Sequence, residues 1–355
     1  MTEFHIINPF RHASGGSENR AMVLASMLQP YAKVTLWATG TPDPQLASQA
    51  PIRVINPFKL AFPRTGTFIF VGAYYWLTSW IRLARPSRCI VVFNTPDASE
   101  LHGFLHRVCG DNIAGCELVY ASTETAAAAG LPGTVEPSPI DLTRFKPRHQ
   151  PRHRAPSDFV VGRLSRDIAY KFHAGEPAFL SQLAAQGMTV RVMGGTCISD
   201  ALKGSSGVEL LPACAESAND FLSGLDCFYY RTSPEWHEPF GRVVFEAMAC
   251  AIPPVCHVGG DYARFIRSGE NGFLFRTEAE AAQQIKALRS DPALRKRIGA
   301  AARHTVEAMY DKRYWERVRA FYLTGALPPV AARHAAAMDY PALERMRQSL
   351  QVPSV

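Results

Sequence analysis

The sequence lacks the features that mark several common classes of protein. Its eight cysteines form no CxxC pair and no zinc-like spacing with histidine, so a reduced cytosolic compartment is the simplest expectation. The most apolar segment, residues 68–81, is shorter than the roughly 20 residues that span a bilayer as a helix. The N-terminal stretch MTEFHIINPF has no basic region followed by a long apolar run, so we expect no secretion signal.

Acidic residues are outnumbered. The 38 lysines and arginines exceed the 31 aspartates and glutamates, which gives a net charge of +7. Such an excess favours an anionic partner, which could be nucleic acid, acidic lipid or a phosphorylated small molecule. No zinc finger, RNA-recognition signature or long basic helix is present, so nucleic acid is the least expected of the three.

The pattern of apolar runs predicts an α/β protein with two domains. A length of 355 residues suits two domains better than one. Strand-like runs at 4–7, 33–38, 89–94 and 116–122 alternate with helical patterns, as in a parallel sheet wound with helices. Proline and basic residues crowd 144–158, which indicates a linker, and a second α/β series follows it. We predict two Rossmann-like domains, at 1–150 and 151–325, and a tail at 326–355 with a short helix at 341–350.

The stretch HEPFGRVVFEAMAC, residues 237–250, carries the strongest chemical signal. Pro239 and Gly241 keep the chain irregular, so a helix should begin near Gly241 or Arg242. Glu238 then lies just ahead of a helix N-terminus, where free amides and the helix dipole favour phosphate. Glu246 would lie roughly 7 to 8 Å along the helix axis. The two carboxylates could hold hydroxyls on either side of a diphosphate; alternatively, Glu238 only complements the dipole and Glu246 is solvated.

This stretch resembles the retaining glycosyltransferases of family 4. Their signature places two glutamates, separated by seven residues, around a Phe-Gly pair and before Ala-Met-Ala, as Glu238, Phe240, Gly241 and Glu246 are placed here. Further resemblance lies in a glycine-rich loop at 9–22, a D-x-x-x-F spacing from Asp141 to Phe145, and the segment 258–275. The resemblance implies a GT-B fold, in which two Rossmann-like domains face each other across a cleft.

The resemblance also assigns roles to individual residues. Glu238 would position the sugar hydroxyls and Glu246 the ribose, while His102, preferred to His106, would lie near the reacting sugar. Arg163 and Lys171 would contact the diphosphate, where their charges could neutralise the leaving group. The donor-binding set it implies is Gly15, Gly16, Arg163, Lys171, Glu238, Phe240, Gly241, Arg242 and Glu246. The glycines would let backbone amides approach the diphosphate without a Cβ in the way.

The chain departs from the family pattern in three places. Lys171 follows Arg163 by eight residues instead of the common five, and Phe172 replaces the usual next glycine. Ala251 stands where a glycine normally follows the Ala-Met-Ala-Cys run. The acidic residue expected after the glycine pair is replaced by Ala263 or Arg264. These departures concern local packing and specificity more than activity.

The resemblance implies a hexosyl transfer with retention at the anomeric carbon. The donor would be a nucleotide-diphosphate sugar carrying UDP or GDP, and the acceptor a saccharide or a lipid-linked oligosaccharide in polysaccharide or lipid-linked oligosaccharide biosynthesis. No metal or other cofactor is expected, because cationic side chains replace it and the sequence has no DxD cluster. Two other functions fit the same architecture: a sugar-nucleotide epimerase or hydrolase, and a non-catalytic binding protein.

Residues 68–88 bear on where the enzyme works. They join an aromatic run to Arg82, Arg85 and Arg88. Read as a helix, the segment could meet anionic headgroups at the cytoplasmic face of a membrane. It could also be a packed helix of the N-terminal domain with a core of aromatics, which its nearly all-round apolarity favours.

Overall fold

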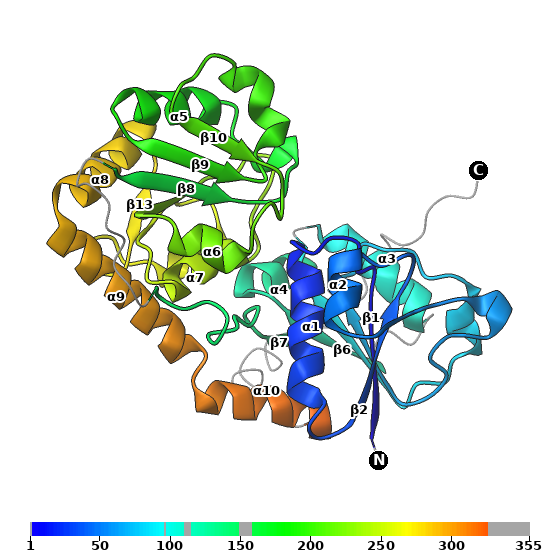
Figure 1. Ribbon diagram of the computed structural model, residues 1–355. Coiled ribbons are helices and arrows are strands. Elements are labelled where there is room, and N and C mark those ends of the chain that lie inside the picture. Colours follow the sequence, from blue (N-terminus) through cyan, green and yellow to red (C-terminus); the bar gives the residue numbers. More distant parts are fainter. Residues whose placement is uncertain (1, 96, 110–114, 149–157, 326–355) are drawn as a thin grey trace. The chain divides into compact units, whose positions relative to one another are not determined.

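The computed structural model describes residues 2–95, 97–109, 115–148 and 158–325 (Figure 1). The chain forms two compact units, each with its own parallel sheet. Of the described residues, the first unit holds those within 2–10, 24–137 and 315–325, and the second holds those within 11–23 and 138–314. Most of the predicted linker 144–158 and the whole predicted helix at 341–350 lie outside the described residues. The two predicted Rossmann-like folds are confirmed.

The sheet of the first unit has seven parallel strands in the order β3-β2-β1-β4-β5-β6-β7. Its strands are β1 (Glu3–Asn8), β2 (Lys33–Ala38), β3 (Ile52–Val54), β4 (Thr67–Val71), β5 (Arg88–Phe93), β6 (Cys116–Tyr120) and β7 (Thr134–Val135). The helices of this unit are α2 (Pro44–Gln49), α3 (Ala98–Cys109) and α4 (Thr123–Ala129). Helices α1 (Gly16–Leu28) and α10 (Lys312–Thr324) belong to it in part, because residues 16–23 and 312–314 fall in the second unit. Central strands such as β4 are buried along their whole length, because helices cover both faces of a parallel sheet.

The sheet of the second unit has six parallel strands in the order β10-β9-β8-β11-β12-β13. Its strands are β8 (Val160–Leu164), β9 (Thr189–Met193), β10 (Val208–Leu211), β11 (Cys227–Tyr230), β12 (Pro254–His257) and β13 (Phe273–Phe275). Its helices are α5 (Glu176–Ala185), α6 (Ala218–Ser223), α7 (Arg242–Ala249), α8 (Glu278–Ser290) and α9 (Pro292–Met309). The strand order reverses between β8 and β11, as in a dinucleotide-binding fold.

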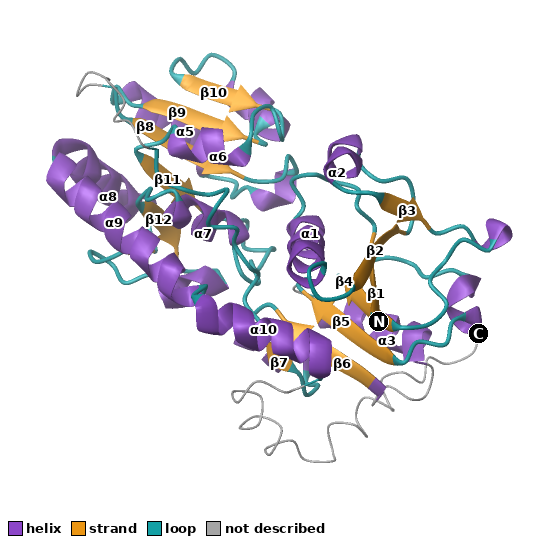
Figure 2. Ribbon diagram, turned by 60° about the horizontal axis from the view of Figure 1, so that its bottom comes forward, coloured by secondary structure: helices purple, strands orange, loops and turns teal. Residues whose placement is uncertain are grey.

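Helices flank the second sheet on both sides. The side chains of α5 and α8 pack into one core cluster with β8, β9 and β11. Helices α6 and α7 contact β8, β11 and β12, and in Figure 1 they lie on the side of the sheet away from α5. Figure 2 shows α8 and α9 side by side, and the two helices are in contact. Because helices cover both faces of the sheet, the carboxyl ends of its strands are left to the loops that lead into those helices.

The helix considered for residues 68–88 is wrong. Thr67–Val71 forms strand β4, the chain turns at Gly72 with φ of 83°, and only Ser79–Leu83 is helical, as a 3₁₀ turn. A short, fully buried run looks alike in a parallel strand and in a buried helix, so periodicity could not separate them. The core interpretation of its aromatics holds for Tyr75 and Trp80, which are buried in the aromatic core of the first unit. Within the described ranges, no helix is both long and apolar enough to cross a bilayer.

Candidate functional site

The candidate site follows the ends of two neighbouring strands of the second unit. Strands β8 and β11 are hydrogen-bonded neighbours at the point where the strand order reverses. Lys171 lies in a 3₁₀ turn after β8, and Glu238 lies in the loop after β11. In open α/β sheets, ligands bind at this switch point, outside the carboxyl ends of the strands. The fold therefore places both predicted residues where the general rule expects a ligand.

Lys171 and Glu238 form an ion pair. The lysine Nζ lies 2.7 Å from Oε2 of Glu238, and the Tyr230 hydroxyl donates to the same oxygen at 2.9 Å. The indole Nε1 of Trp236 donates to it as well, at 3.4 Å. The lysine ammonium also lies 4.1 Å from the centre of the Trp236 ring, a cation–π contact. Three donors thus converge on one carboxylate oxygen.

The surroundings set the charge of this pair. Burial raises the pKa of Glu238, but the charge of Lys171 and the three donors outweigh it, so the pKa lies below its usual value. Burial lowers the pKa of Lys171, and the attraction of Glu238 only partly offsets this effect. Glu238 is therefore ionised at neutral pH. An oxygen that accepts from three donors is also poorly placed to act as a nucleophile.

Helix α7 begins at Arg242, which confirms the predicted start. Gly241 caps it with φ of 78°, a conformation that favours glycine, and an added Cβ would lie 2.4 Å from the Tyr262 ring. Phe240 stacks on Phe245 of the helix with ring centres 4.3 Å apart. The carbonyl of Glu238 accepts from the amide of Asp261. The loop that carries Glu238 is thus held on both sides of the motif.

Glu246 is buried, so the alternative that treated it as a solvated helix residue is wrong. It accepts from Nε of Arg242 at 2.7 Å, one helical turn earlier. Arg242 is held in turn by the Pro139 carbonyl at 2.5 Å. Burial raises the pKa of Glu246, and the charges of Arg242 and Arg144 oppose that rise without cancelling it. Glu246 is thus the second carboxylate of the site, and its burial disfavours the ionised form.

Arg163 does not lie as the resemblance suggested. Its side chain, at the end of β8, is fully buried, and it donates to both carboxylate oxygens of Glu176, at 2.6 and 2.8 Å. It also donates to the backbone carbonyls of Lys171 and Arg231. The structure brings Arg163 beside Lys171 but turns its guanidinium into the unit. The arginine connects the segments that follow β8 and β11.

The glycine-rich loop runs from β1 into α1, as predicted. The amide of Gly15 donates to the His12 carbonyl, and a Cβ at this position would lie 2.0 Å from a carboxylate oxygen of Glu18. Gly16 begins α1, and a Cβ there would meet nothing within 4 Å. A side chain at position 15 would thus displace the carboxylate of Glu18, whereas local packing gives no reason for a glycine at 16.

His102 lies in the middle of α3, in the first unit. Its Nε2 makes a 3.0 Å hydrogen bond with the carbonyl of Ala129, which can only accept. That ring nitrogen therefore carries the proton, and the other one, Nδ1, is left as an acceptor in the neutral ring.

Several residues around the site were not identified from the sequence. Tyr230 and Trp236 belong to the segment just before Glu238, so aromatic residues beside the motif were the available signal. Glu176 gave no signal, because its pairing with Arg163 arises only when α5 packs on the sheet. Among the described residues, no group of three or more His, Cys, Asp or Glu side chains is placed to hold a metal ion.

Two Rossmann-like units with these strand orders define the GT-B class of fold. Residues 197–305 match the family model "Glycosyl transferases group 1". Spore coat protein SA of Bacillus subtilis is 33% identical over 89 residues, or 24% of this chain and 23% of that protein. A D-inositol 3-phosphate glycosyltransferase of an Arthrobacter species is 28% identical over 218 residues, or 53% of this chain and 48% of that enzyme.

The similarity in structure extends over nearly the whole chain. The crystal structure of the Anabaena protein HepE in complex with UDP-glucose superimposes with a TM-score of 0.67 at 17% identity. The superposition covers 92% of this chain and all of that one. At this level of identity the likeness establishes the fold. The curated relatives above are matched over less than half of their own lengths.

Proposed function

We propose that the protein is a glycosyltransferase that takes a sugar from a nucleotide-diphosphate donor. The observation that carries the proposal is the Lys171–Glu238 pair, placed at the switch point of the second sheet and just ahead of α7. The family match over residues 197–305 includes Glu238 and α7. The name of the Arthrobacter relative and the UDP-glucose bound to HepE support the same donor chemistry.

Each side chain of the pair has a distinct role in this proposal. Lys171 and the N-terminus of α7 bind the diphosphate, where positive charge stabilises the leaving group. Glu238, ionised and held by Tyr230 and Trp236, accepts from hydroxyls of the donor sugar. Arg163 acts as a positioning residue, because it holds the Lys171 carbonyl from within the unit. Phe240 and Gly241 set the entry of the chain into α7.

The ribose is assigned to Glu246. Its carboxylate is aligned by Arg242, and its raised pKa shows that burial works against the ionised form. A ribose hydroxyl that donates to this carboxylate would offset part of that cost. Gly15 and Gly16 are assigned to the donor diphosphate and His102 to the reacting sugar. Since Nε2 of His102 already donates to Ala129, only Nδ1 could meet the sugar, as an acceptor.

We propose that transfer proceeds with retention. The bond between the anomeric carbon and the phosphate oxygen breaks while the acceptor oxygen bonds to the same face. The acceptor proton passes to the leaving phosphate oxygen, and nucleoside diphosphate departs. We assign Glu238 no role as a nucleophile, and its Oε2 already accepts from Lys171, Tyr230 and Trp236. Lys171 and the helix N-terminus supply the positive charge, so the proposed reaction uses no metal.

The wider assignments follow the same proposal. Residues 1–150 form the acceptor-side domain and 151–325 the donor domain. The donor carries UDP or GDP. The acceptor is a saccharide or a lipid-linked oligosaccharide. The product belongs to the biosynthesis of a polysaccharide or of a lipid-linked oligosaccharide. The enzyme works in the cytoplasm, in peripheral contact with the anionic inner face of the membrane. Assignment to family 4 rests on the paired glutamates around Phe240 and Gly241.

Turnover assays test the proposal. UDP-, GDP- and ADP-sugars are incubated with and without octyl glycosides of glucose, galactose and mannose, and released nucleoside diphosphate is measured. We expect release from one donor to rise with an acceptor and the product to keep the donor's anomeric configuration by NMR. Equal release without acceptor would point to a hydrolase or epimerase. Donor binding with no turnover for any acceptor would point to a binding protein.

A further inference from the structure

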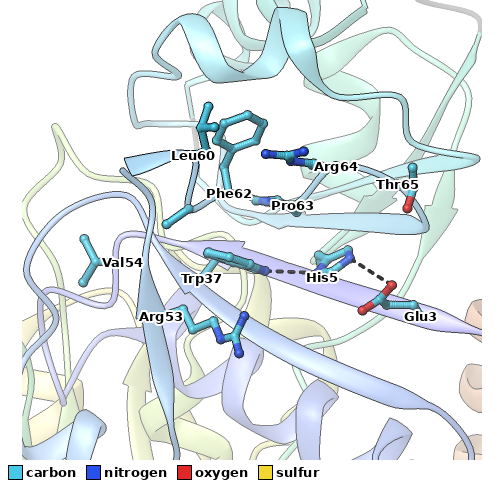
Figure 3. A pocket seen from close by; sticks show the side chains of 11 residues that line it. Glu3, His5, Trp37, Arg53, Val54, Leu60, Phe62, Pro63, Arg64 and Thr65 are labelled. Carbon is cyan, nitrogen blue, oxygen red and sulfur yellow. Dashed lines mark hydrogen bonds and ion pairs between the residues drawn. The ribbon is translucent and has the colours of Figure 1, made fainter. Parts of the chain in front are cut away.

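A pocket lies in the first unit, and none of the residues of the candidate site lines it. Its volume is about 540 Å³, which is within the range of pockets that hold small molecules. Strands β1 and β2 supply its floor, with His5 and Trp37, and the chain between β3 and β4 supplies its rim (Figure 3). None of the roles proposed above uses this pocket.

The floor of the pocket is occupied by hydrogen bonds of its own. The Trp37 indole donates to Nδ1 of His5 at 3.0 Å, so that nitrogen carries no proton. Burial is the main cause that lowers the pKa of His5, which keeps the ring neutral at neutral pH. Glu3, at one end, is paired with Lys33 at 2.8 Å. The hydrogen bond from Lys33 lowers the pKa of Glu3, so this carboxylate stays ionised and is paired with the lysine.

Two arginines at the rim are available for an anion. The guanidinium of Arg53 lies over the Trp37 ring at 5.7 Å, and that of Arg64 lies over the Phe62 ring at 5.5 Å. Both side chains are exposed, and neither has a carboxylate partner among the described residues. Stacking on an aromatic ring holds a guanidinium in place and leaves its N–H groups to a ligand. In Figure 3 the two arginines lie on opposite sides of Trp37 and His5.

All charged residues of the segment that forms the rim are basic. Residues 44–96 contain no aspartate or glutamate, and they contain Arg53, Lys59, Arg64, Arg82, Arg85 and Arg88. Arg88 is paired with Glu117 outside this stretch. The amide of Arg85 donates to the carbonyl of Arg64 at 2.7 Å, which brings the 82–85 turn beside the rim. This surface therefore suits an anionic partner larger than a single ion.

Exposed apolar side chains stand at and beside this rim, because Leu60 lines the pocket and Phe58 lies two residues before it. Phe58 is 100% exposed at the tip of the 3₁₀ turn Pro57–Lys59, and Leu60 is 60% exposed. The turn is closed by a pair of hydrogen bonds between the backbones of Asn56 and Ala61. The backbone of the tip is therefore fixed, and it exposes the ring of Phe58 to water, which is unfavourable for an apolar side chain. A soluble phosphorylated ligand in the pocket would not require it, whereas the interior of a lipid layer would take it up.

We propose that the pocket binds the phosphate of an anionic phospholipid. Arg53 and Arg64 hold the phosphate between them, and Phe58 and Leu60 enter the apolar boundary of the leaflet. Lys59 lies beside them on the headgroup level. The inference deepens the membrane contact of the proposed function, because it names the lipid chemistry and the residues. It replaces the interfacial helix considered for 68–88. Membrane binding needs no donor or acceptor, so it can fail while the transferase assays succeed.

Vesicle co-sedimentation of the full chain tests this proposal. Vesicles of phosphatidylcholine alone are compared with vesicles containing one quarter phosphatidylglycerol, at low and high salt. We expect binding to the anionic vesicles only, decreasing with salt. Arg53→Gln with Arg64→Gln should weaken binding roughly 30-fold, and Phe58→Ser should weaken it several-fold. Lys286→Gln with Lys296→Gln, two exposed lysines of the second unit, removes the same charge and should leave binding unchanged.

A soluble headgroup separates pocket binding from diffuse attraction. Glycerol 1-phosphate should compete with anionic vesicles for the wild-type protein and not for the double arginine variant. Thermal melts of the variants confirm that they fold, as expected for exposed positions. Wild-type protein that stays in the supernatant at low salt would overturn the proposal. So would equal vesicle binding by the Arg53/Arg64 and Lys286/Lys296 variants, or glycerol 1-phosphate binding without any vesicle binding.

Discussion

A single carboxylate oxygen organises the candidate site. Oε2 of Glu238 accepts from Lys171, Tyr230 and Trp236, and the side chains of Lys171 and Glu238 are only 7% and 14% exposed. A buried ion pair is weak evidence for stability, because both charges lose their hydration. Its position at a switch point is better explained by a ligand that both charges meet. Two substitutions separate these contributions.

The first prediction concerns the pair itself. Glu238→Gln leaves Lys171 charged and unpaired in a buried place, so the free energy of unfolding should fall by about 3 to 5 kcal/mol. Lys171→Met added to that variant should restore part of the loss, since the two sites are coupled. Urea unfolding of both variants measures the effect. A double variant that is less stable than Glu238→Gln would show that the two side chains do not interact in solution.

The pH dependence of the same pair has a defined sign. The pKa of Glu238 is lowered in the folded protein, so its stabilisation is present above the ordinary carboxyl range. That stabilisation is lost as the pH falls through the lowered pKa. The wild-type protein should therefore lose its advantage over Glu238→Gln as the pH falls below about 4.5. An advantage that is unchanged at pH 3 would contradict the assigned charge state.

The second prediction distinguishes function from folding at Glu246. The folded protein raises the pKa of this residue, so its ionised form lowers stability at neutral pH, and protonation as the pH falls relieves that cost. Glu246→Gln removes that cost and leaves Arg242 its hydrogen bond to the Pro139 carbonyl, so the free energy of unfolding should change by no more than about 1 kcal/mol. The binding free energy of the nucleotide should weaken by roughly 1.5 to 3 kcal/mol. Unchanged nucleotide binding by calorimetry would show that Glu246 does not contact the ribose.

At the scale of elements, the start of α7 depends on one glycine. Gly241 has φ of 78°, and a Cβ there would collide with the Tyr262 ring. Its control is Gly269, which has φ of 82° and open space around it. Gly269→Ala should cost about 1 to 2 kcal/mol from the backbone conformation alone. Gly241→Ala should cost more, because the ring must also move. Thermal unfolding of both variants checks this third prediction, and equal losses would contradict the contact.

The end of α7 explains one departure from the family pattern. Ala251 has φ of 59°. Its amide donates to the Met248 carbonyl, and the amide of Ile252 donates to the Ala247 carbonyl. These are the bonds of a left-handed helix C-cap, where glycine is the usual residue. The alanine therefore keeps the same backbone turn as the expected glycine. The alanine adopts this conformation with more backbone strain than a glycine would, and the helix still ends at the same turn.

At the scale of the whole molecule, local patterns predicted the elements better than the directions of side chains. Alternating apolar and helical runs predicted both sheets, and Pro239 with Gly241 predicted where α7 begins. Residues 68–88 were misread because a buried strand such as Thr67–Val71 has no period to distinguish it. The sequence could not predict that Arg163 turns inward, because its partner Glu176 meets it only once α5 packs on the sheet.

Calorimetric titration with UDP and with GDP tests the central claim most directly, namely that the switch point of the second sheet binds a nucleotide diphosphate. The account predicts that one of the two binds with one-site stoichiometry. Lys171→Ala should weaken that binding by about 1.5 to 3 kcal/mol, the value of a charge-assisted hydrogen bond. No binding of either nucleotide to the wild-type protein, or equal affinity in Lys171→Ala, would contradict the account.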